Sequence, residues 1–543
     1  MKTRAETLRA IESQAFDICV IGAGATGAGC ALDAQLRGLR TVLVDAGDFG
    51  SATSSASTKL VHGGVRYLQE AVVDLAPGQI KVVREALRER VLMLQNAPHL
   101  AHAREFVVPC FSRFESWYYA LGMKLYDWIA GDAKLGRSQW LTPAQVLSAL
   151  PTLTRENLVG GVSYQDGQFD DARYCLALVK TFASVGGEAA NYLKVTSFQK
   201  DSAGRIQAAI VEDRCTGQSL TLRARTFVNA TGPFSDSVRM RANPAVLSRL
   251  VLSRGAHILL PLVGDATPAL LIPKTEDGRV IFAIPWLGRL LVGTTDQEVT
   301  LDGDLTVTRD EAEYLLQYIN RYSTLHYTAQ DVVSAFAGVR PLVRAKQSKE
   351  TRKLIRGHEV DVDALSGLVS ILGGKWTTYR AMAEETIDVV QRQLGAGVPS
   401  STRRHRLIGT DGYNPEDWRL LATEHELGEA EARYLMQKFG SEAAEVLAVA
   451  GDHPEFKSRV VAGAPSIQAE IVYCARKEMA LTIEDVLARR LGLQFYSWKL
   501  SIEAAPKVGF ILAHELGWSE DRRNLAIQEY VSRIEGQLAA LTS

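Results

Sequence analysis

One glycine-rich segment near the start of the chain constrains its fold more than any other feature. Residues 16–21 (FDICVI) form a short apolar run that is typical of a buried parallel strand. Gly22, Gly24 and Gly27 follow directly in the spacing G-x-G-x-x-G, and a helix is predicted after them. In a dinucleotide-binding βαβ unit these glycines allow a tight turn, a close approach of the pyrophosphate and the packing of the helix on the strand. The helix N-terminus then faces the phosphates.

A second predicted strand completes this unit. Residues 41–44 are apolar and lead into Asp45, which lies 21 residues after Gly24. An acidic side chain at this place accepts hydrogen bonds from the ribose hydroxyls of a bound dinucleotide. A glycine-rich turn alone would fit many α/β proteins, but strand, glycines, helix, strand and acid in this order predict dinucleotide binding. The fingerprint does not distinguish FAD from NAD.

Length and composition limit the class of protein. With 543 residues the chain is too long for one compact domain, at about 150 residues per domain. Hydrophobic residues make up 46% and charged residues 23%, which excludes a disordered, collagen-like or disulfide-stabilised chain. The formal net charge is −1, so no overall field attracts nucleic acid, and no nucleic-acid partner is expected.

The cysteines and the apolar segments indicate the compartment. The six cysteines lie far apart and form no C-x-x-C pair, so neither a metal site nor a redox dithiol is expected. Reduced thiols of this kind are typical of the cytoplasm. Residues 1–16 lack the apolar core of a signal peptide, and no stretch approaches the about 18 apolar residues of a transmembrane helix. We therefore expect a cytoplasmic protein that does not span a membrane.

The pattern of apolar and polar residues along the sequence changes near residue 395. Residues 1–395 alternate short apolar runs with amphipathic stretches and glycine-rich turns, which predicts an α/β or α+β core. Residues 396–415 are aperiodic and polar, as in a linker. Residues 416–543 are predicted to form a helical domain, in which Thr482 and Asp485 resemble a capping box.

Several further motifs make a family resemblance visible. Residues 52–67 read ATSSASTKLVHGGVRY, and this segment resembles the FAD-dependent glycerol-3-phosphate dehydrogenases of the aerobic, quinone-linked type. Other matching motifs, in chain order, are NATGP (229–233), RVIFAIPW (279–286), VGTTD (292–296), GVRPL (338–342) and GGKWTTYR (373–380). The resemblance extends over nearly the whole chain. It implies a Rossmann-like FAD-binding domain of the amino-acid-oxidase-like type, an antiparallel-sheet substrate domain and a helical C-terminal domain.

The resemblance also divides residues 1–395, the expected FAD-dependent oxidoreductase core, into interleaved pieces. The FAD-binding pieces are expected near residues 15–75, 170–240 and 335–395. The substrate-binding pieces are expected near residues 76–169 and 241–334.

The reaction that the resemblance implies is the oxidation of sn-glycerol 3-phosphate to dihydroxyacetone phosphate, with a hydride passing from C2 to FAD. Such an enzyme holds a phosphate dianion and supplies a base for the proton of the C2 hydroxyl. Arginine suits the phosphate because its planar guanidinium donates two charge-assisted hydrogen bonds at once. By the resemblance, the substrate-binding residues are Arg66, Tyr67, Arg279, Arg340 and Arg356.

Two histidines compete for the role of the base. His62 directly precedes a Gly-Gly turn beside the flavin, and an imidazole of ordinary pKa accepts a proton near neutral pH. His257 is the alternative, because the family places it near the ring as well. Either histidine would also fit a structural role as a donor to a backbone carbonyl. The expected catalytic set is His62, His257 and Arg340.

The resemblance implies the remaining cofactor contacts. Thr231 and Gly232 are expected beside the ADP half of FAD, and Val195 beside the adenine. The residues expected beside the flavin half are Ser54, Ser55, Thr58, Lys59, Gly374, Lys375 and Thr377. The serines would alternatively fit a polar loop that caps a helix.

A reduced flavin requires an electron acceptor. The sequence contains no iron–sulfur cysteine set, haem motif or second nucleotide fingerprint, so a diffusible acceptor is implied. The resemblance favours quinone over oxygen, places the protein peripherally on the inner face of the cytoplasmic membrane, and leaves a homodimer open. Residues 117–130 (WYYALGMKLYDWIA) have the aromatic composition of a helix at a membrane surface, although core helices show such stripes too.

Two other functions fit part of the pattern. An amine or amino-acid oxidase of the same fold would use the dinucleotide unit, but it requires a carboxylate-binding site and leaves HGGVRY and GVRPL unexplained. A non-catalytic electron-transfer subunit would bind a flavin that no polyol phosphate reduces.

Overall fold

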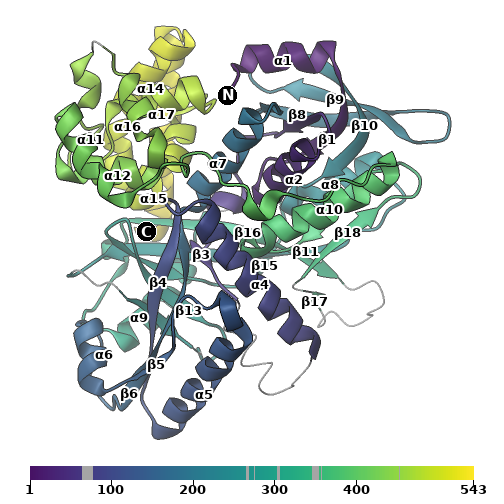
Figure 1. Ribbon diagram of the computed structural model, residues 1–543. Coiled ribbons are helices and arrows are strands. Elements are labelled where there is room, and N and C mark those ends of the chain that lie inside the picture. Colours follow the sequence, from purple (N-terminus) through teal and green to yellow (C-terminus); the bar gives the residue numbers. More distant parts are fainter. Residues whose placement is uncertain are drawn as a thin grey trace.

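The computed structural model describes residues 1–63, 77–264, 268–273, 275–301, 306–344, 354–355, 357–451 and 453–542. Three residues predicted to bind substrate, Arg66, Tyr67 and Arg356, lie outside the described residues. Two sheets and a group of C-terminal helices make up the molecule (Figure 1).

The first sheet contains the predicted dinucleotide-binding unit. Its central strands run in parallel in the order β19 (Val369–Gly373), β10 (Ser219–Asn229), β1 (Ala15–Ile21), β2 (Thr41–Val44) and β7 (Glu188–Ala190). The antiparallel neighbours are β18 (His358–Val362), β8 (Leu193–Lys200) and β9 (Ile206–Asp213). β1 and β2 are apolar and almost continuously buried, as strands covered on both faces are. The predicted strands at 16–21 and 41–44 are confirmed.

Helices cover this sheet. The glycine turn ends in α2 (Ala25–Leu36), which packs against α7 (Asp171–Ser184) and α10 (Tyr379–Leu394). Two more helices, α1 (Arg4–Ser13) and α8 (Ser235–Ala242), lie by the same sheet. Because α2 starts at Gly24, its N-terminus is at the end of β1, as the fingerprint requires.

The second sheet is mainly antiparallel, which confirms the sheet type expected for the substrate domain. Its order is β17 (Leu354–Ile355), β16 (Ser334–Arg344), β11 (Leu250–Pro261), β14 (Arg289–Gly293), β13 (Ile281–Trp286), β12 (Ala269–Ile272), β4 (Ala101–Cys110), β6 (Gly160–Phe169) and β3 (Leu60–Val61). β15 (Gln297–Val299) joins β11, and β5 (Gln139–Leu141) joins β6. The pair of β12 and β4 is parallel. Four helices surround this sheet: α4 (Pro77–Asn96), α5 (Arg113–Ala130), α6 (Pro143–Ala149) and α9 (Arg309–Tyr322).

Two segments connect the sheets. β3 and β16 belong to ranges that the sequence placed among the FAD-binding pieces, and the structure shows them in the second sheet. β16 runs along most of β11 and then reaches toward β19 of the first sheet. The substrate and dinucleotide regions therefore share strands at their boundary.

The C-terminal part of the chain is helical. Its helices are α11 (Trp418–His425), α12 (Glu429–Phe439), α13 (Ala443–Ala448), α14 (Gln468–Lys477), α15 (Leu493–Tyr496), α16 (Trp498–Leu516) and α17 (Glu520–Thr542). The predicted cap is present, because the Asp485 amide donates to Thr482 Oγ1 over 3.1 Å. Residues Asp485–Arg490 form a π-helical turn, η10, instead of the regular α-helix that a capping box introduces.

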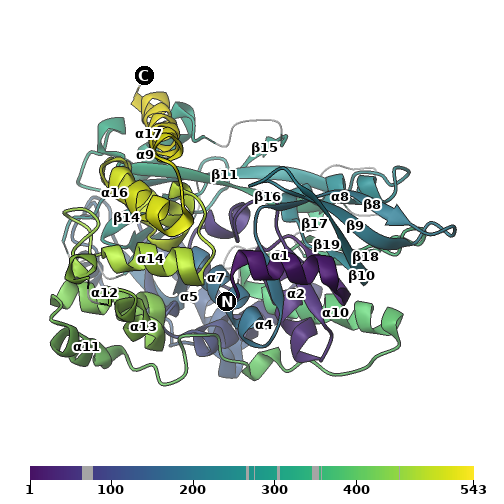
Figure 2. The same ribbon diagram turned by 90° about the horizontal axis from the view of Figure 1, so that it is seen from above.

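The C-terminal helices are packed into the rest of the molecule. One apolar core joins Ile258 and Leu260 of the second sheet to Ile471, Val486 and Leu512. Figures 1 and 2 show α7 between the C-terminal helices and α2. Within the described part of the chain, no helix has the length and apolarity that crossing a membrane requires.

Candidate functional site

The glycine turn leaves no room for side chains. A Cβ at Gly27 would lie 1.7 Å from the carbonyl oxygen of Gly22, and one at Gly22 would lie 2.7 Å from that of Ala230. Gly22 also has a φ of +100°, which favours glycine. A Cβ at Gly24 would meet Ser54 Oγ at 2.8 Å. The turn is thus a close backbone crossing of the kind that dinucleotide phosphates require.

Asp45 stands beside this turn. Its carboxylate accepts the amide hydrogens of Ala23 over 2.6 Å and of Gly47 over 2.8 Å. Burial raises the pKa of Asp45 to about 6, although both hydrogen bonds act in the opposite direction. The carboxylate is therefore ionised at neutral pH and accepts further donors, such as ribose hydroxyls.

The other residues expected on the ADP side lie at neighbouring strand ends. Thr231 and Gly232 follow β10, and a Cβ at Gly22 would come within 2.9 Å of Thr231 Cα. Val195 lies in β8, whose first residue, Leu193, donates its amide to the carbonyl of Asp45. The structure therefore brings these residues to the side of the glycine turn.

The loop after β2 contains Ser54 and Ser55, which were expected beside the flavin half of the cofactor. Ser54 Oγ accepts the amide of Ala25 over 3.0 Å, which puts this serine at the N-terminus of α2. Ser55 is buried, and its carbonyl accepts Lys59 Nζ over 2.7 Å. Both serines thus make the helix-end and loop contacts that were the alternative interpretation.

Lys59 does not line the cavity between the two sheets, although its neighbours Thr58 and Leu60 do. Its ammonium pairs with Asp171 at 2.5 Å and lies within 4.8–5.3 Å of the ring centres of Trp286, Phe336 and Phe495. Only 1% of Lys59 is exposed. A buried carboxylate more than a hundred positions along the chain holds the ammonium, and the cofactor contact of Lys59 stays a prediction.

A cavity of about 400 Å³ lies between the two sheets. The predicted residues that line it are Thr58, His62, His257, Arg279, Arg340, Gly374, Lys375 and Thr377. Gly374 has a φ of +99°, and a Cβ there would meet Met382 Cε at 2.1 Å, so the GGK turn needs glycine. The cavity therefore collects the residues expected for catalysis and for the flavin half of the cofactor.

The two histidines differ in their surroundings. His62 donates its backbone amide to Thr377 Oγ1 over 3.2 Å, and its ring lies 6.3 Å from that of Phe282. Burial lowers the pKa of His62, Lys375 lowers it further, and Asp166 acts in the opposite direction. A neutral imidazole is ready to accept a proton.

His257 is more tightly enclosed. Only 1% of it is exposed, its ring stacks on Phe336 at 4.9 Å, and Nε2 lies 2.9 Å from Thr58 Oγ1. Burial first, and then the charges of Arg340 and Lys59, hold the pKa of His257 well below its usual range. His257 is thus held by a stacked ring and a hydroxyl group, whereas His62 is less buried where it lines the cavity.

The two arginines that the structure describes are held at the cavity wall. Arg340 Nη2 donates to Thr294 Oγ1 over 2.7 Å, and Nη1 donates to the carbonyl of Thr295 over 3.2 Å. Arg279 pairs with Asp277 at 3.0 Å and lies over the ring of Tyr314. Because these side chains keep about a third of their surface exposed, at 35% and 31%, their guanidinium groups remain accessible to an anion.

Two parts of the site carried no sequence signal for their role. Tyr119 and Met123 of α5 line the cavity, whereas the aromatic pattern of that helix indicated a membrane surface or a core stripe. Tyr126 accepts the amide of Gly63 over 3.0 Å and donates to the buried Asp166 over 3.0 Å. This chain of hydrogen bonds holds Gly63, the residue after His62, and no spacing in the sequence points to it.

Comparison with family models covers most of the chain. Residues 17–389 match the model described as FAD dependent oxidoreductase, and residues 400–523 match that described as the C-terminal domain of alpha-glycerophosphate oxidase.

Named relatives are similar to nearly the whole of this chain and over most of their own length. The mitochondrial glycerol-3-phosphate dehydrogenase SDP6 of Arabidopsis thaliana is 38% identical over 96% of this chain and 86% of its own. The mitochondrial glycerol-3-phosphate dehydrogenase of Mus musculus is 40% identical over 94% of this chain and 71% of its own.

A solved structure gives the same result for the fold. The glycerol-3-phosphate dehydrogenase of Bacillus halodurans, complexed with FAD, superimposes with a TM-score of 0.80 at 30% identity, over 99% of this chain and 97% of the other. The predicted fold class and the FAD cofactor are confirmed, which decides between FAD and NAD. The tight glycine turn, the half-buried carboxylate of Asp45 and the cavity at the GGK turn fit this cofactor.

Proposed function

The chain belongs to the family of FAD-dependent glycerol-3-phosphate dehydrogenases, and we propose that it oxidises sn-glycerol 3-phosphate to dihydroxyacetone phosphate. The observation that carries this proposal is that Arg279, Arg340 and His62 line one cavity together with the GGK turn. When bound, FAD supplies the acceptor for the hydride that leaves C2 of the substrate.

Arg279 and Arg340 are the proposed phosphate-binding residues. Arg340 is anchored by Thr294 and Thr295, and Arg279 by Asp277, so both guanidinium groups are held at the cavity wall. A phosphate dianion in the cavity would accept charge-assisted hydrogen bonds from these arginines. The phosphate then fixes which carbon of the glycerol backbone reaches the reaction centre.

His62 is the proposed base. The proton of the C2 hydroxyl passes to a neutral imidazole nitrogen of His62 as the hydride leaves C2, so that charge and electrons balance. The lowered pKa of His62 keeps the imidazole neutral before reaction. His257, stacked on Phe336 and close to Thr58, then orders the cavity wall.

Lys375 and Thr377 are the proposed contacts to the flavin. Both line the cavity at the GGK turn, and Thr377 also holds the His62 backbone. A cation at this place stabilises negative charge that develops on a reduced ring. The same turn thus links the cofactor position to the proposed base.

The outer face of α5 supports a peripheral membrane contact. Phe114, Trp117 and Trp128 are 74%, 65% and 69% exposed, and their spacing puts them on one side of the helix. Aromatic side chains in such a row insert into the interface of a bilayer. α5 lies at the opposite end of the molecule from α11, α14 and α17 (Figure 1).

Quinone is the proposed electron acceptor. The opposite face of α5 carries Tyr119 and Met123 into the cavity, so one helix borders both the proposed bilayer contact and the redox site. An apolar quinone in the bilayer would reach the cavity beside this helix. In a cell, this contact corresponds to the inner face of the cytoplasmic membrane.

A steady-state assay tests the reaction. Purified protein is mixed with sn-glycerol 3-phosphate and a short-chain quinone, and dihydroxyacetone phosphate and quinol are measured together. Equal amounts of both products are expected. Glycine and proline replace the substrate in parallel, and turnover with either of these in place of sn-glycerol 3-phosphate would favour an amine or amino-acid oxidase.

A vesicle assay tests the membrane contact. Trp117→Ala combined with Trp128→Ala should reduce co-sedimentation with anionic phospholipid vesicles while the reduction of a soluble quinone continues. Phe510→Ala is the matched control, because Phe510 is 65% exposed on α16 of the C-terminal part. An equal loss of vesicle binding in both variants would contradict a role for α5.

A further inference from the structure

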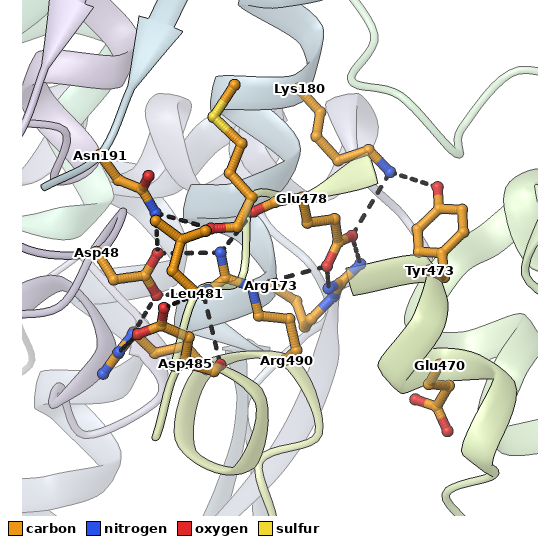
Figure 3. A network of polar contacts seen from close by, with 12 residues as sticks. Asp48, Arg173, Lys180, Asn191, Glu470, Tyr473, Glu478, Leu481, Asp485 and Arg490 are labelled. Carbon is orange, nitrogen blue, oxygen red and sulfur yellow. Dashed lines mark hydrogen bonds and ion pairs between the residues drawn. The ribbon is translucent and has the colours of Figure 1, made fainter. Parts of the chain in front are cut away.

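A buried ion network joins the dinucleotide-binding region to the C-terminal helices (Figure 3). It contains four acidic and four basic side chains, all of which are almost completely buried. They are Asp48, Glu442, Glu478 and Asp485 together with Arg173, Lys180, Arg489 and Arg490. We call this set the interdomain ion network.

Asp48 is the end of this network on the dinucleotide side. Arg489 Nε donates to its Oδ2 over 2.6 Å, and Arg490 Nη2 donates to its Oδ1 over 3.0 Å. Asn191 Nδ2 donates to Oδ1 as well, over 3.0 Å. The side chains of Asp48 and Arg490 are fully buried. Asp48 therefore has two arginines of the C-terminal part as its charge partners.

The two arginines are themselves fixed. They end the π-helical turn η10, and Asp485 at its start pairs with Arg489 at 2.6 Å. Arg490 Nη2 also donates to the carbonyl of Glu478 over 2.6 Å. π-Helical turns are rare and occur frequently at functional sites. Here the turn directs two successive arginines at one carboxylate.

Asp48 lies in the same loop as Asp45. The Gly47 amide donates to the Asp45 carboxylate, and the Gly50 amide donates to the carbonyl of Ala23 in the glycine turn. The Ser51 amide donates back to the carbonyl of Asp48 over 3.1 Å. The loop is thus one hydrogen-bonded unit, and a displacement of Asp48 moves the carboxylate of Asp45.

We propose that the C-terminal part of the chain completes the FAD site: Arg489 and Arg490 are positioning residues that, through Asp48, hold Asp45 at the adenosine half of the cofactor. The loop contains two glycines, Gly47 and Gly50, and needs a rigid support at its other end. A buried ion pair adds little net stability compared with apolar packing, whereas removal of one partner leaves a buried charge without compensation. This inference concerns FAD alone and is independent of the substrate.

Ligand titrations of the full-length chain freed of FAD test this inference. Asp48→Asn is expected to raise the Kd for FAD by about tenfold or more, which corresponds to about 1.4 kcal/mol. The Kd for ADP should rise by the same factor, because the expected partner of Asp45 is the ribose of the adenosine half. The Kd for FMN, which lacks that half, should stay the same.

Arg489→Lys is the second variant, for the case in which Asp48→Asn does not fold. It keeps the positive charge but loses the planar fork. A smaller rise in the Kd for FAD and ADP is expected, again without a change for FMN.

Glu442→Gln is the matched control. Glu442 pairs with Lys180 across the same interface at 2.6 Å, at the end of the network away from Asp48. The Glu442→Gln variant should have a lower unfolding temperature and an unchanged Kd for FAD. The inference is overturned if Glu442→Gln raises the Kd for FAD as much as Asp48→Asn does. It is also overturned if Asp48→Asn, or Arg489→Lys, lowers stability but leaves the Kd for ADP unchanged.

Discussion

The glycine turn and the cavity are built in opposite ways. The turn comes from one continuous stretch, in which β1, three glycines, α2 and β2 follow one another and Asp45 ends the unit. The cavity is assembled from loops and strands between Thr53 and Thr377 that meet only in the folded molecule. The turn therefore depends on local backbone geometry, and the cavity depends on packing between distant parts of the chain.

A single methyl group in the turn should have the largest effect. Gly27→Ala places a Cβ 1.7 Å from the carbonyl of Gly22, so the helix and strand separate or the turn opens. We expect the purified protein to lack the flavin absorption band. Gly536→Ala is the control, since a Cβ at that helical position meets nothing within 4 Å. A Gly27→Ala protein with a full flavin content would contradict the assigned geometry.

Among substitutions in the cavity, loss of the proposed base should have the next largest effect. His62→Gln should slow anaerobic flavin reduction by sn-glycerol 3-phosphate by about 10²–10⁴-fold, the usual contribution of a general base. Stopped-flow spectroscopy measures this rate while FAD remains bound. If His257→Gln were the slower variant, the roles of the two histidines would be reversed.

The pH dependence of the same rate follows from the pKa of His62. A base acts in its neutral form, so the rate should rise with pH through the pKa and then level off. Because burial lowers the pKa of His62, the rise should occur below the ordinary imidazole value of about 6.5 and be complete near neutrality. A rate that still increases between neutral and alkaline pH would require another group.

Replacement of the buried Lys59 distinguishes a structural role of this side chain from a contact with the cofactor. Lys59→Met leaves the carboxylate of Asp171 buried without its ion pair, which should lower the free energy of unfolding by about 3–5 kcal/mol. Urea unfolding measures the change, and Lys59→Met combined with Asp171→Asn should recover most of it. Normal stability together with a shifted flavin spectrum would restore the predicted cofactor contact.

Arginine replacement at the cavity wall should have the smallest effect of the series. Arg340→Lys keeps the charge but loses the planar fork that would bind the phosphate, at a cost of about 1.5–3 kcal/mol. We expect a higher KM for sn-glycerol 3-phosphate in steady-state kinetics and an unchanged flavin content. An unchanged KM would remove Arg340 from the phosphate site.

These differences explain which parts the sequence predicted. The strands around the glycine turn and the position of Asp45 follow from a local pattern, and both are confirmed. The FAD cofactor and the fold came from the motif resemblance, and the comparisons confirm them. The roles of His62 and Arg340 stay predictions that the cavity geometry supports.

Contacts between distant residues were beyond sequence reasoning. Lys59 lies in a matching motif, yet its ammonium is held by Asp171, and no spacing connects the two. Asp48 and Arg490 are separated by 442 positions and share two hydrogen bonds. The helical character of the C-terminal part was predictable, but its charge pairing with the dinucleotide loop required the folded structure.

The visible spectrum of the purified protein, recorded anaerobically before and after addition of sn-glycerol 3-phosphate, tests the central claim most directly. The cavity geometry and the family predict that the flavin band bleaches with this substrate and stays unchanged with glycerol, which lacks the phosphate that Arg279 and Arg340 would bind. A flavin that remains oxidised with sn-glycerol 3-phosphate would contradict the proposed reaction.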